Sequence, residues 1–194
     1  KNNTGAKLRY ISKNNLNIAR INYIKKTFPD SFCIVPFRDP FEHAPSLLRQ
    51  HKNFSKIHDN DSFSSKYMSD IGHFEFGHNL KPIDFQGWVT GENIYDPFKL
   101  EYWLNYWIIS YEYLFNTVSD DITFISFESL CKDPADSLKH LAAVLDIKNG
   151  ENLLNNAKRV SPPKLFNIDK KTLSTHLVEK ANSLYRALET VSII

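Results

Sequence analysis

FCIVPFRDPFE, residues 32 to 42, is the segment most informative about the fold of this chain. Its first six residues form a continuous apolar run with β-branched and aromatic side chains, which is typical of a strand that is buried on both faces. Asp39 and Pro40 are residue types that favour a helix N-cap and a first helical position, and Glu42 stands at the capping-box position. The stretch therefore predicts a buried strand that leads directly into a helix.

The same kind of pattern recurs along the chain. Residues 122–127 form a second apolar run, and helical spacing of apolar residues lies before, between and after the two runs. Buried strands separated by helices predict an α/β fold with a parallel sheet. We also expect a short strand at residues 9–11, and a helix that Pro45 interrupts and that restarts there and runs to about Ser55. Residues 57–95 predict irregular structure covering a site.

Composition limits the class of protein. The chain has 194 residues, 42% of them apolar and with a net charge of +2, which predicts one folded domain over residues 1–194 and no nucleic-acid or membrane partner. No apolar run reaches the 18 residues of a membrane span and no signal-peptide pattern opens the sequence, so we expect a cytoplasmic protein. Cys33 and Cys131 are expected to be buried, reduced thiols.

An arginine follows the predicted buried strand. Ligands of parallel α/β sheets bind at the carboxyl ends of strands beside helix N-termini, and an Arg38 guanidinium there would offer a two-pronged donor to a phosphate. Ser46, eight residues later, could share the same anion from the first turn of a helix that restarts at Pro45. The alternative is that Arg38 pairs with Asp39 or Glu42 on the surface.

Aromatic residues dominate one predicted helix. Leu100 to Phe115 places Trp103 and Trp107 on an apolar helical stripe. We interpret this stripe as a buried core helix and not as an aromatic substrate site. His73 and Glu75 could lie on one strand face as metal ligands, but no third ligand has suitable spacing, so no metal site is expected.

Several of these motifs, taken in order, resemble one known family. They are Lys13-Asn14-Asn15, Phe28-Pro29-Asp30, Arg38-Asp39-Pro40 with Ser46, and Ser126-Phe127-Glu128-Ser129-Leu130 with Asp133-Pro134. Their order and spacing resemble the PAPS-dependent sulfotransferases, especially the bacterial and carbohydrate types. The resemblance covers residues 11 to about 147, and more loosely the last helix.

This resemblance implies a P-loop-NTPase-like sulfotransferase fold with a parallel central sheet flanked by helices. It implies that Arg38 and Ser46 bind the 3′-phosphate of the co-substrate PAPS. It also implies that Lys13 lies beside the transferring sulfuryl group. The acceptor would be a hydroxyl group of a small molecule or a carbohydrate, and no metal would be needed.

Two departures from the family pattern stand out. Ser12 occupies a position where many members carry an acidic base, so His43 becomes the candidate catalytic base, with His51 and Glu42 also near in sequence. The family's Gly-rich phosphosulfate loop has no counterpart, because the twelve residues before Lys13 contain only Gly5. We therefore expect a sulfotransferase that lacks its N-terminal βα unit, with a sheet edge or core face that a second copy could cover as a homodimer. The alternative is a non-catalytic nucleotide- or anion-binding module, or an inactive truncated remnant of the same fold.

Overall fold

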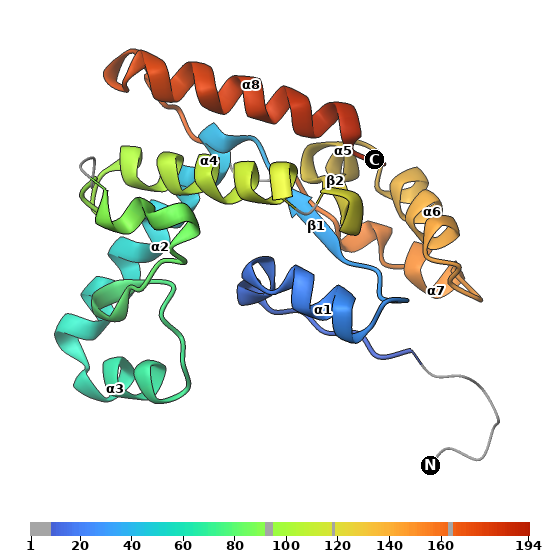
Figure 1. The fold of residues 1–194 in the computed structure, drawn as a ribbon, viewed down its shortest axis with the longest axis horizontal. Helices are drawn as coiled ribbons and strands as arrows, with labels where there is room; N and C mark the ends of the chain where they lie inside the picture. Colours follow the sequence, from blue (N-terminus) through green and yellow to red (C-terminus); the bar gives the residue numbers. More distant parts are fainter. Residues whose placement is uncertain (1–8, 92–94, 118, 163–164) are drawn as a thin grey trace.

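The computed structural model describes residues 9–91, 95–117, 119–162 and 165–194, and this part of the chain is mostly helical (Figure 1). The α-helices are α1 (Ile21–Thr27), α2 (Pro40–Asn60), α3 (Ser62–Asp70), α4 (Leu100–Thr117), α5 (Phe127–Lys132), α6 (Pro134–Val144), α7 (Glu151–Leu154) and α8 (Thr175–Val191). Short 3-10 helices cover Asn15–Ala19, Gly77–Asn79, Phe85–Thr90, Ser119–Asp121, Ala157–Arg159 and Lys170–Thr172.

Within the described residues the sheet has two strands, β1 (Ile34–Phe37) and β2 (Thr123–Ser126), which pair in parallel. Ile34 lies opposite Thr123 and Phe37 opposite Ser126, so both strands end at the same level. The predicted α/β class with parallel pairing is confirmed. The strand predicted at residues 9–11 is wrong, because this segment is irregular and its Tyr10 and Ile11 side chains are 91% and 88% exposed, with no sheet to bury them.

The core is built around α4, which packs between α2 and α8. Trp103 and Trp107 are each 2% exposed, which confirms that the aromatic stripe is a core helix. The Trp103 indole N–H donates to the carbonyl of Pro97 at 2.8 Å, so this large side chain is satisfied as well as buried.

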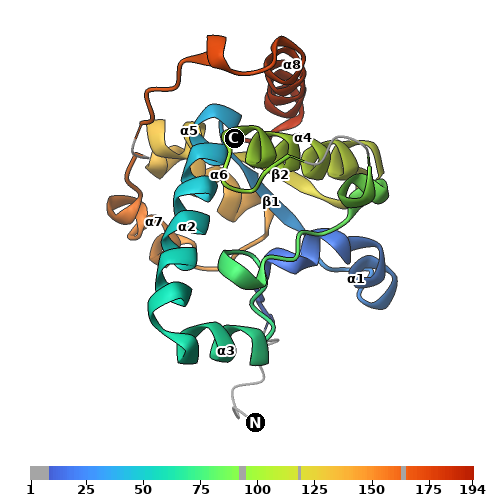
Figure 2. The same cartoon turned by 90° about the vertical axis from the view of Figure 1, so that its left-hand side faces the viewer.

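The strands lie between helices on two sides. Figures 1 and 2 show α4 and α8 on one side of β1 and β2 and α1 on the other. Phe37 of β1 is fully buried, and its ring meets Phe124 of β2 and Tyr185 of α8 edge-on, with ring centres 6.3 and 5.8 Å apart. This aromatic contact fixes the strands against α8.

Helix α2 is one continuous helix, so the predicted restart at Pro45 is wrong. The Asp39 carboxylate accepts the Phe41 N–H at 2.7 Å and caps the first turn, and Phe41, Ala44 and Pro45 are buried against the core. This burial offsets the hydrogen bond that a proline inside a helix cannot make. The irregular segment predicted for residues 57–95 is also wrong at its start, since α2 continues to Asn60 and α3 follows at the end of α2 that lies away from the sheet (Figure 1).

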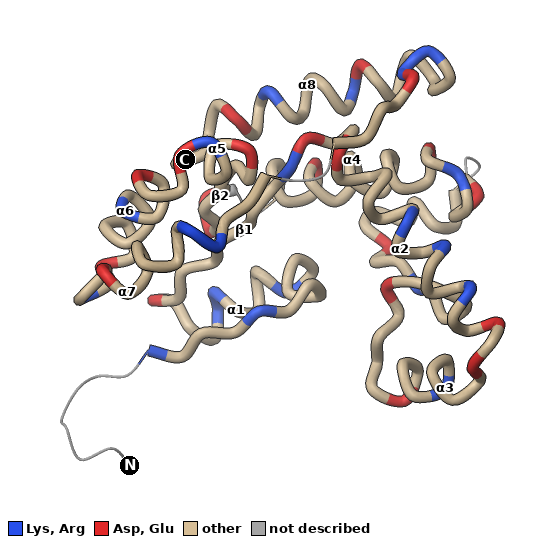
Figure 3. Tube along the Cα trace, turned by 180° about the vertical axis from the view of Figure 1, so that it is seen from behind, with Lys and Arg blue, Asp and Glu red and all other residues tan. Residues whose placement is uncertain are grey.

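Charged residues of both signs occur along α8, as Figure 3 shows, so this helix carries no stripe of a single sign. Among the described residues, no helix combines the length and the apolar character that crossing a bilayer requires. Cys33 and Cys131 are free cysteines, as predicted, but both are half-buried where full burial was expected.

Candidate functional site

Arg38 lies where the carboxyl ends of the two strands meet. It follows β1, and its guanidinium carbon lies 4.9 Å from the ring centre of Phe127, the residue that follows β2. The side chain is half-buried, and its Nε atom is buried with no hydrogen-bond partner among the described residues. An unpartnered buried donor is unusual in a folded protein, so this Nε is a candidate donor to a bound anion.

The neighbouring carboxylates do not pair with this guanidinium. Asp39 caps α2, and the Glu42 carboxylate accepts the backbone N–H of Phe166 at 3.0 Å. In the described part of the chain, no carboxylate lies within ion-pair distance of Arg38. The alternative in which Arg38 pairs with Asp39 or Glu42 is therefore not observed.

Glu128 joins the two strand ends. One carboxylate oxygen accepts the Asp39 backbone N–H at 3.1 Å, and the other accepts the Tyr185 hydroxyl of α8 at 3.4 Å. Burial, together with this carboxylate, raises the pKa of Tyr185, so the phenol stays a donor at neutral pH. Glu128 thus fixes the turn that carries Arg38, and sequence reasoning assigned it no role. The available signal was its position after β2, which mirrors that of Arg38-Asp39 after β1.

His43 lies in the first turns of α2, close enough to Arg38 to feel its charge. Burial, and then this charge, lower the pKa of His43 from 6.5 to about 4. The imidazole is therefore neutral at pH 7, and its Nδ1 atom is buried with no hydrogen-bond partner among the described residues. A conjugate acid with a pKa near 4 makes His43 a weak base in the unliganded protein.

The other two predicted site residues are less closely tied to Arg38. Ser46 is half-buried at the seventh position of α2, one turn after His43 on the same side of the helix. Because α2 is continuous from Pro40, the prediction that Ser46 belongs to the first turn is wrong. Lys13 is exposed just before Asn14, the N-cap of the Asn15–Ala19 helix, and makes no ion pair or hydrogen bond with any described residue.

Tyr111 closes the buried side of this region. Its hydroxyl donates to the carbonyl of Pro36 at 2.9 Å, and burial raises its pKa, so it remains protonated. Arg38, His43, Glu128, Tyr111 and Tyr185 therefore form one polar group around the strand ends. This group can hold an anion through Arg38 and the start of α2. The Glu128 carboxylate is hydrogen-bonded to the Asp39 N–H and the Tyr185 hydroxyl.

Two other features of the described chain were considered as candidate sites. His73 Nδ1 lies 3.4 Å from a carboxylate oxygen of Glu75, and no group of three or more metal-ligating side chains occurs in the described residues. An open cavity of about 690 Å³ lies between α5, α6 and residues 193–194, and its lining includes charges of both signs but not Arg38. Neither feature competes with the strand ends as a site.

Comparison with protein-family models, with curated proteins and with solved structures yields no match to this chain. Evidence on function therefore comes from the geometry around Arg38 and from the order of the motifs. The geometry brings Arg38 and His43 together, keeps Ser46 one turn away, and leaves Lys13 without a described contact to them.

Proposed function

We propose that the carboxyl end of β1 and the first turns of α2 bind the 3′-phosphate of PAPS, and that the chain serves sulfuryl transfer from PAPS to a hydroxyl acceptor. The observation that carries the proposal is a pair of buried nitrogen atoms, Arg38 Nε and His43 Nδ1, without partners among the described residues. Two such atoms beside a helix N-terminus would suit a phosphate that accepts a hydrogen bond from each.

The electrostatics favour a phosphate over a neutral ligand. The Arg38 charge has no carboxylate partner in the described residues, and the start of α2 adds a partial positive charge. The Glu128 carboxylate accepts hydrogen bonds from the Asp39 N–H and the Tyr185 hydroxyl, one on each oxygen, and makes no ion pair with Arg38 among the described residues. Ser46 would add a hydroxyl donor from the second turn.

The proposed reaction breaks the bond between sulfur and the oxygen that bridges it to the 5′-phosphate. The acceptor oxygen forms the new sulfur–oxygen bond, its proton passes to a base, and adenosine 3′,5′-bisphosphate leaves. Lys13 would offset charge on the bridging oxygen, as the family resemblance implies. His43 would serve as base only if bound phosphate raises its pKa from about 4, as a nearby negative charge does.

A second candidate is an anion-binding module without catalysis. The observation that favours it is that none of the six glycines belongs to a G-x-x-x-x-G-K or G-x-G-x-x-G motif. Transfer needs a second anchor for the 5′-phosphosulfate, and consecutive backbone N–H groups usually supply it. We therefore expect this chain to bind the nucleotide better than it turns PAPS over.

The test combines binding and turnover. Calorimetry would compare adenosine 3′,5′-bisphosphate with adenosine 5′-monophosphate, which lacks the 3′-phosphate, and radiolabelled PAPS would report transfer. Tighter binding of the bisphosphate with transfer supports the sulfotransferase. The same preference without transfer supports the binding module. Equal affinity for both nucleotides, or binding of neither, refutes the 3′-phosphate site.

A further inference from the structure

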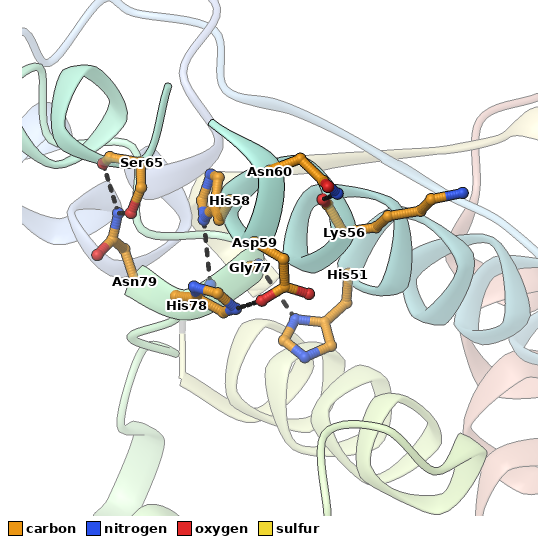
Figure 4. A network of polar contacts seen from close by, with 9 residues as sticks. All are labelled: His51, Lys56, His58, Asp59, Asn60, Ser65, Gly77, His78 and Asn79. Atoms are coloured by element: carbon orange, nitrogen blue, oxygen red, sulfur yellow. Dashed lines mark hydrogen bonds and ion pairs between the residues drawn. The ribbon is translucent and has the colours of Figure 1, made fainter. Parts of the chain in front are cut away.

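Two histidines of α2 hold a distant loop by its backbone. His51 and His58 are seven residues apart on one face of the helix and are 3% and 5% exposed. The Nδ1 atom of His51 accepts the N–H of Gly77, and that of His58 accepts the N–H of His78, each at 3.2 Å. Figure 4 shows both bonds reaching from α2 to the short Gly77–Asn79 helix.

This arrangement fixes the protonation of both rings. An imidazole nitrogen that accepts a hydrogen bond needs its lone pair, so each neutral ring carries its hydrogen on Nε2. His58 Nε2 then faces the sulfur of Met68 in α3 at 3.4 Å. His51 Nε2 is buried without a hydrogen-bond partner among the described residues, beside the rings of Phe98 and Trp103 at 4.7 and 5.5 Å. Both bonds to the loop exist only while the rings are neutral.

The loop fits the histidines closely. Gly77 has a φ of +72°, and a Cβ added there would lie 2.6 Å from two atoms of the His58 ring. Glycine is therefore required for both the backbone conformation and the approach. The preceding Phe76 stacks on Phe54 of α2 at 5.9 Å and meets Trp103 of α4 at 5.6 Å. The loop thus covers aromatic side chains of two core helices.

Charged groups reach the two rings from each neighbouring element. Burial lowers the pKa of His51, Asp96 from the segment before α4 opposes this effect, and His78 adds to it. His58 lies near Asp61, the N-cap of α3, and its ring centre is 5.6 Å from that of His78. His78 is itself paired with Asp59 of α2 at 3.0 Å.

We infer that residues 73–80 form a pH-dependent cover, held on α2 by neutral His51 and His58 and released when either ring takes up a proton. A protonated ring presents N–H at Nδ1, so the accepting atom becomes a donor that faces another donor. The Gly77 and His78 amides then lose their partners, and Phe76 leaves the rings of Phe54 and Trp103. This device is independent of the proposed nucleotide site.

The direction and size of the effect follow from proton linkage. Burial holds the pKa of His51 below its usual 6.5 while the loop is bound, and the released ring regains that ordinary value. Release is therefore favoured as pH falls below about 6.5. By pH 5 the opening equilibrium should rise by up to roughly thirtyfold for the one proton that His51 takes up.

Amide hydrogen exchange followed by NMR on the whole chain tests this inference. Protection of the Gly77 and His78 amides, corrected for the intrinsic effect of pH, should fall between pH 7.5 and 5 by up to about thirtyfold. The Leu184 amide of α8 reports global unfolding and should not follow them. Unchanged protection of Gly77 and His78 across this range in the natural chain would overturn the proposal, whatever the variants do.

Substitutions then identify the groups that respond. Asn places its Oδ1 where the Nδ1 of histidine lies and accepts a hydrogen bond at any pH, so H51N/H58N should keep the loop protected at pH 5. His176 is exposed on α8, and H176N is the matched control that should retain the pH response. If H51N/H58N responds to pH as the natural chain does, other groups drive the release and the inference is wrong.

Discussion

Arg38→Ala tests the candidate site most directly. In the unliganded protein the described contacts of this guanidinium amount to stacking on Phe127 at 4.9 Å, without an ion pair to any described residue. The free energy of unfolding should therefore fall by only about 0.5–1 kcal/mol. Binding of adenosine 3′,5′-bisphosphate should lose a charge-assisted interaction of about 1.5–3 kcal/mol, which corresponds to roughly tenfold to a hundredfold in Kd.

The assay is isothermal calorimetry at fixed salt, with urea denaturation to confirm the fold of each variant. Arg38→Lys keeps the charge but loses Nε and the planar fork, so its affinity should lie between those of the natural chain and Arg38→Ala. Ser46→Ala should cost less than Arg38→Ala. Arg49→Ala is the matched control, since Arg49 is an exposed α2 arginine whose guanidinium stacks on Phe166 at 5.2 Å. A folded Arg38→Ala variant with unchanged affinity would refute the site.

Three further predictions concern other parts of the molecule. Trp107→Ala should lower the free energy of unfolding by about 3–5 kcal/mol in urea, and a normally stable variant with altered acceptor preference would contradict the core assignment. Burial and the Arg38 charge hold the pKa of His43 near 4, against 6.5 in the unfolded chain, so the neutral ring's contribution to stability should be complete above pH 6.5 and decline toward pH 4. His43→Gln should flatten this dependence of stability on pH. An NMR titration of the folded protein in which the His43 ring takes up its proton near pH 6.5 would contradict the prediction. Gly77→Ala should release the loop at every pH, seen as fast exchange of the His78 amide even at pH 7.5, and full protection there would contradict the fit to His58.

Local sequence patterns predicted the two strands and the helix start that surround the candidate site. The apolar runs at residues 32–37 and 122–127 contain β1 and β2, and the capping residues Asp39 and Pro40 begin α2 as expected. These features depend on residues close in sequence, so periodicity and capping rules reach them. The position of Arg38 at the strand end follows from the same rules.

Periodicity and capping rules could not predict contacts between residues that are far apart in the sequence. Pro45 predicts a break in α2, but burial against the core outweighs the lost hydrogen bond. The link from Glu128 to Asp39 spans 89 residues, and the bonds from His51 and His58 to the loop span 26 and 20. Such contacts form only when the chain is folded, so neither Glu128 nor the histidine pair could be assigned from spacing.

The hydrogen bond from Tyr111 to Pro36 has a consequence for how this sheet meets other chains. In a parallel pair, backbone groups of alternate residues face the partner strand, and the bond from Thr123 N–H to the Cys33 carbonyl at 2.8 Å sets that alternation. The backbone of Pro36 therefore faces away from β2. It has no N–H to offer, and Tyr111 already occupies its carbonyl.

The outer side of β2 is occupied as well. The Phe124 carbonyl accepts the N–H of Ile193 at 3.1 Å, and the Ser126 N–H donates to the Ile194 carbonyl at 3.0 Å. An incoming strand would thus find few free backbone groups on either flank of the described sheet. Fibril growth by strand addition is disfavoured for a folded molecule built this way.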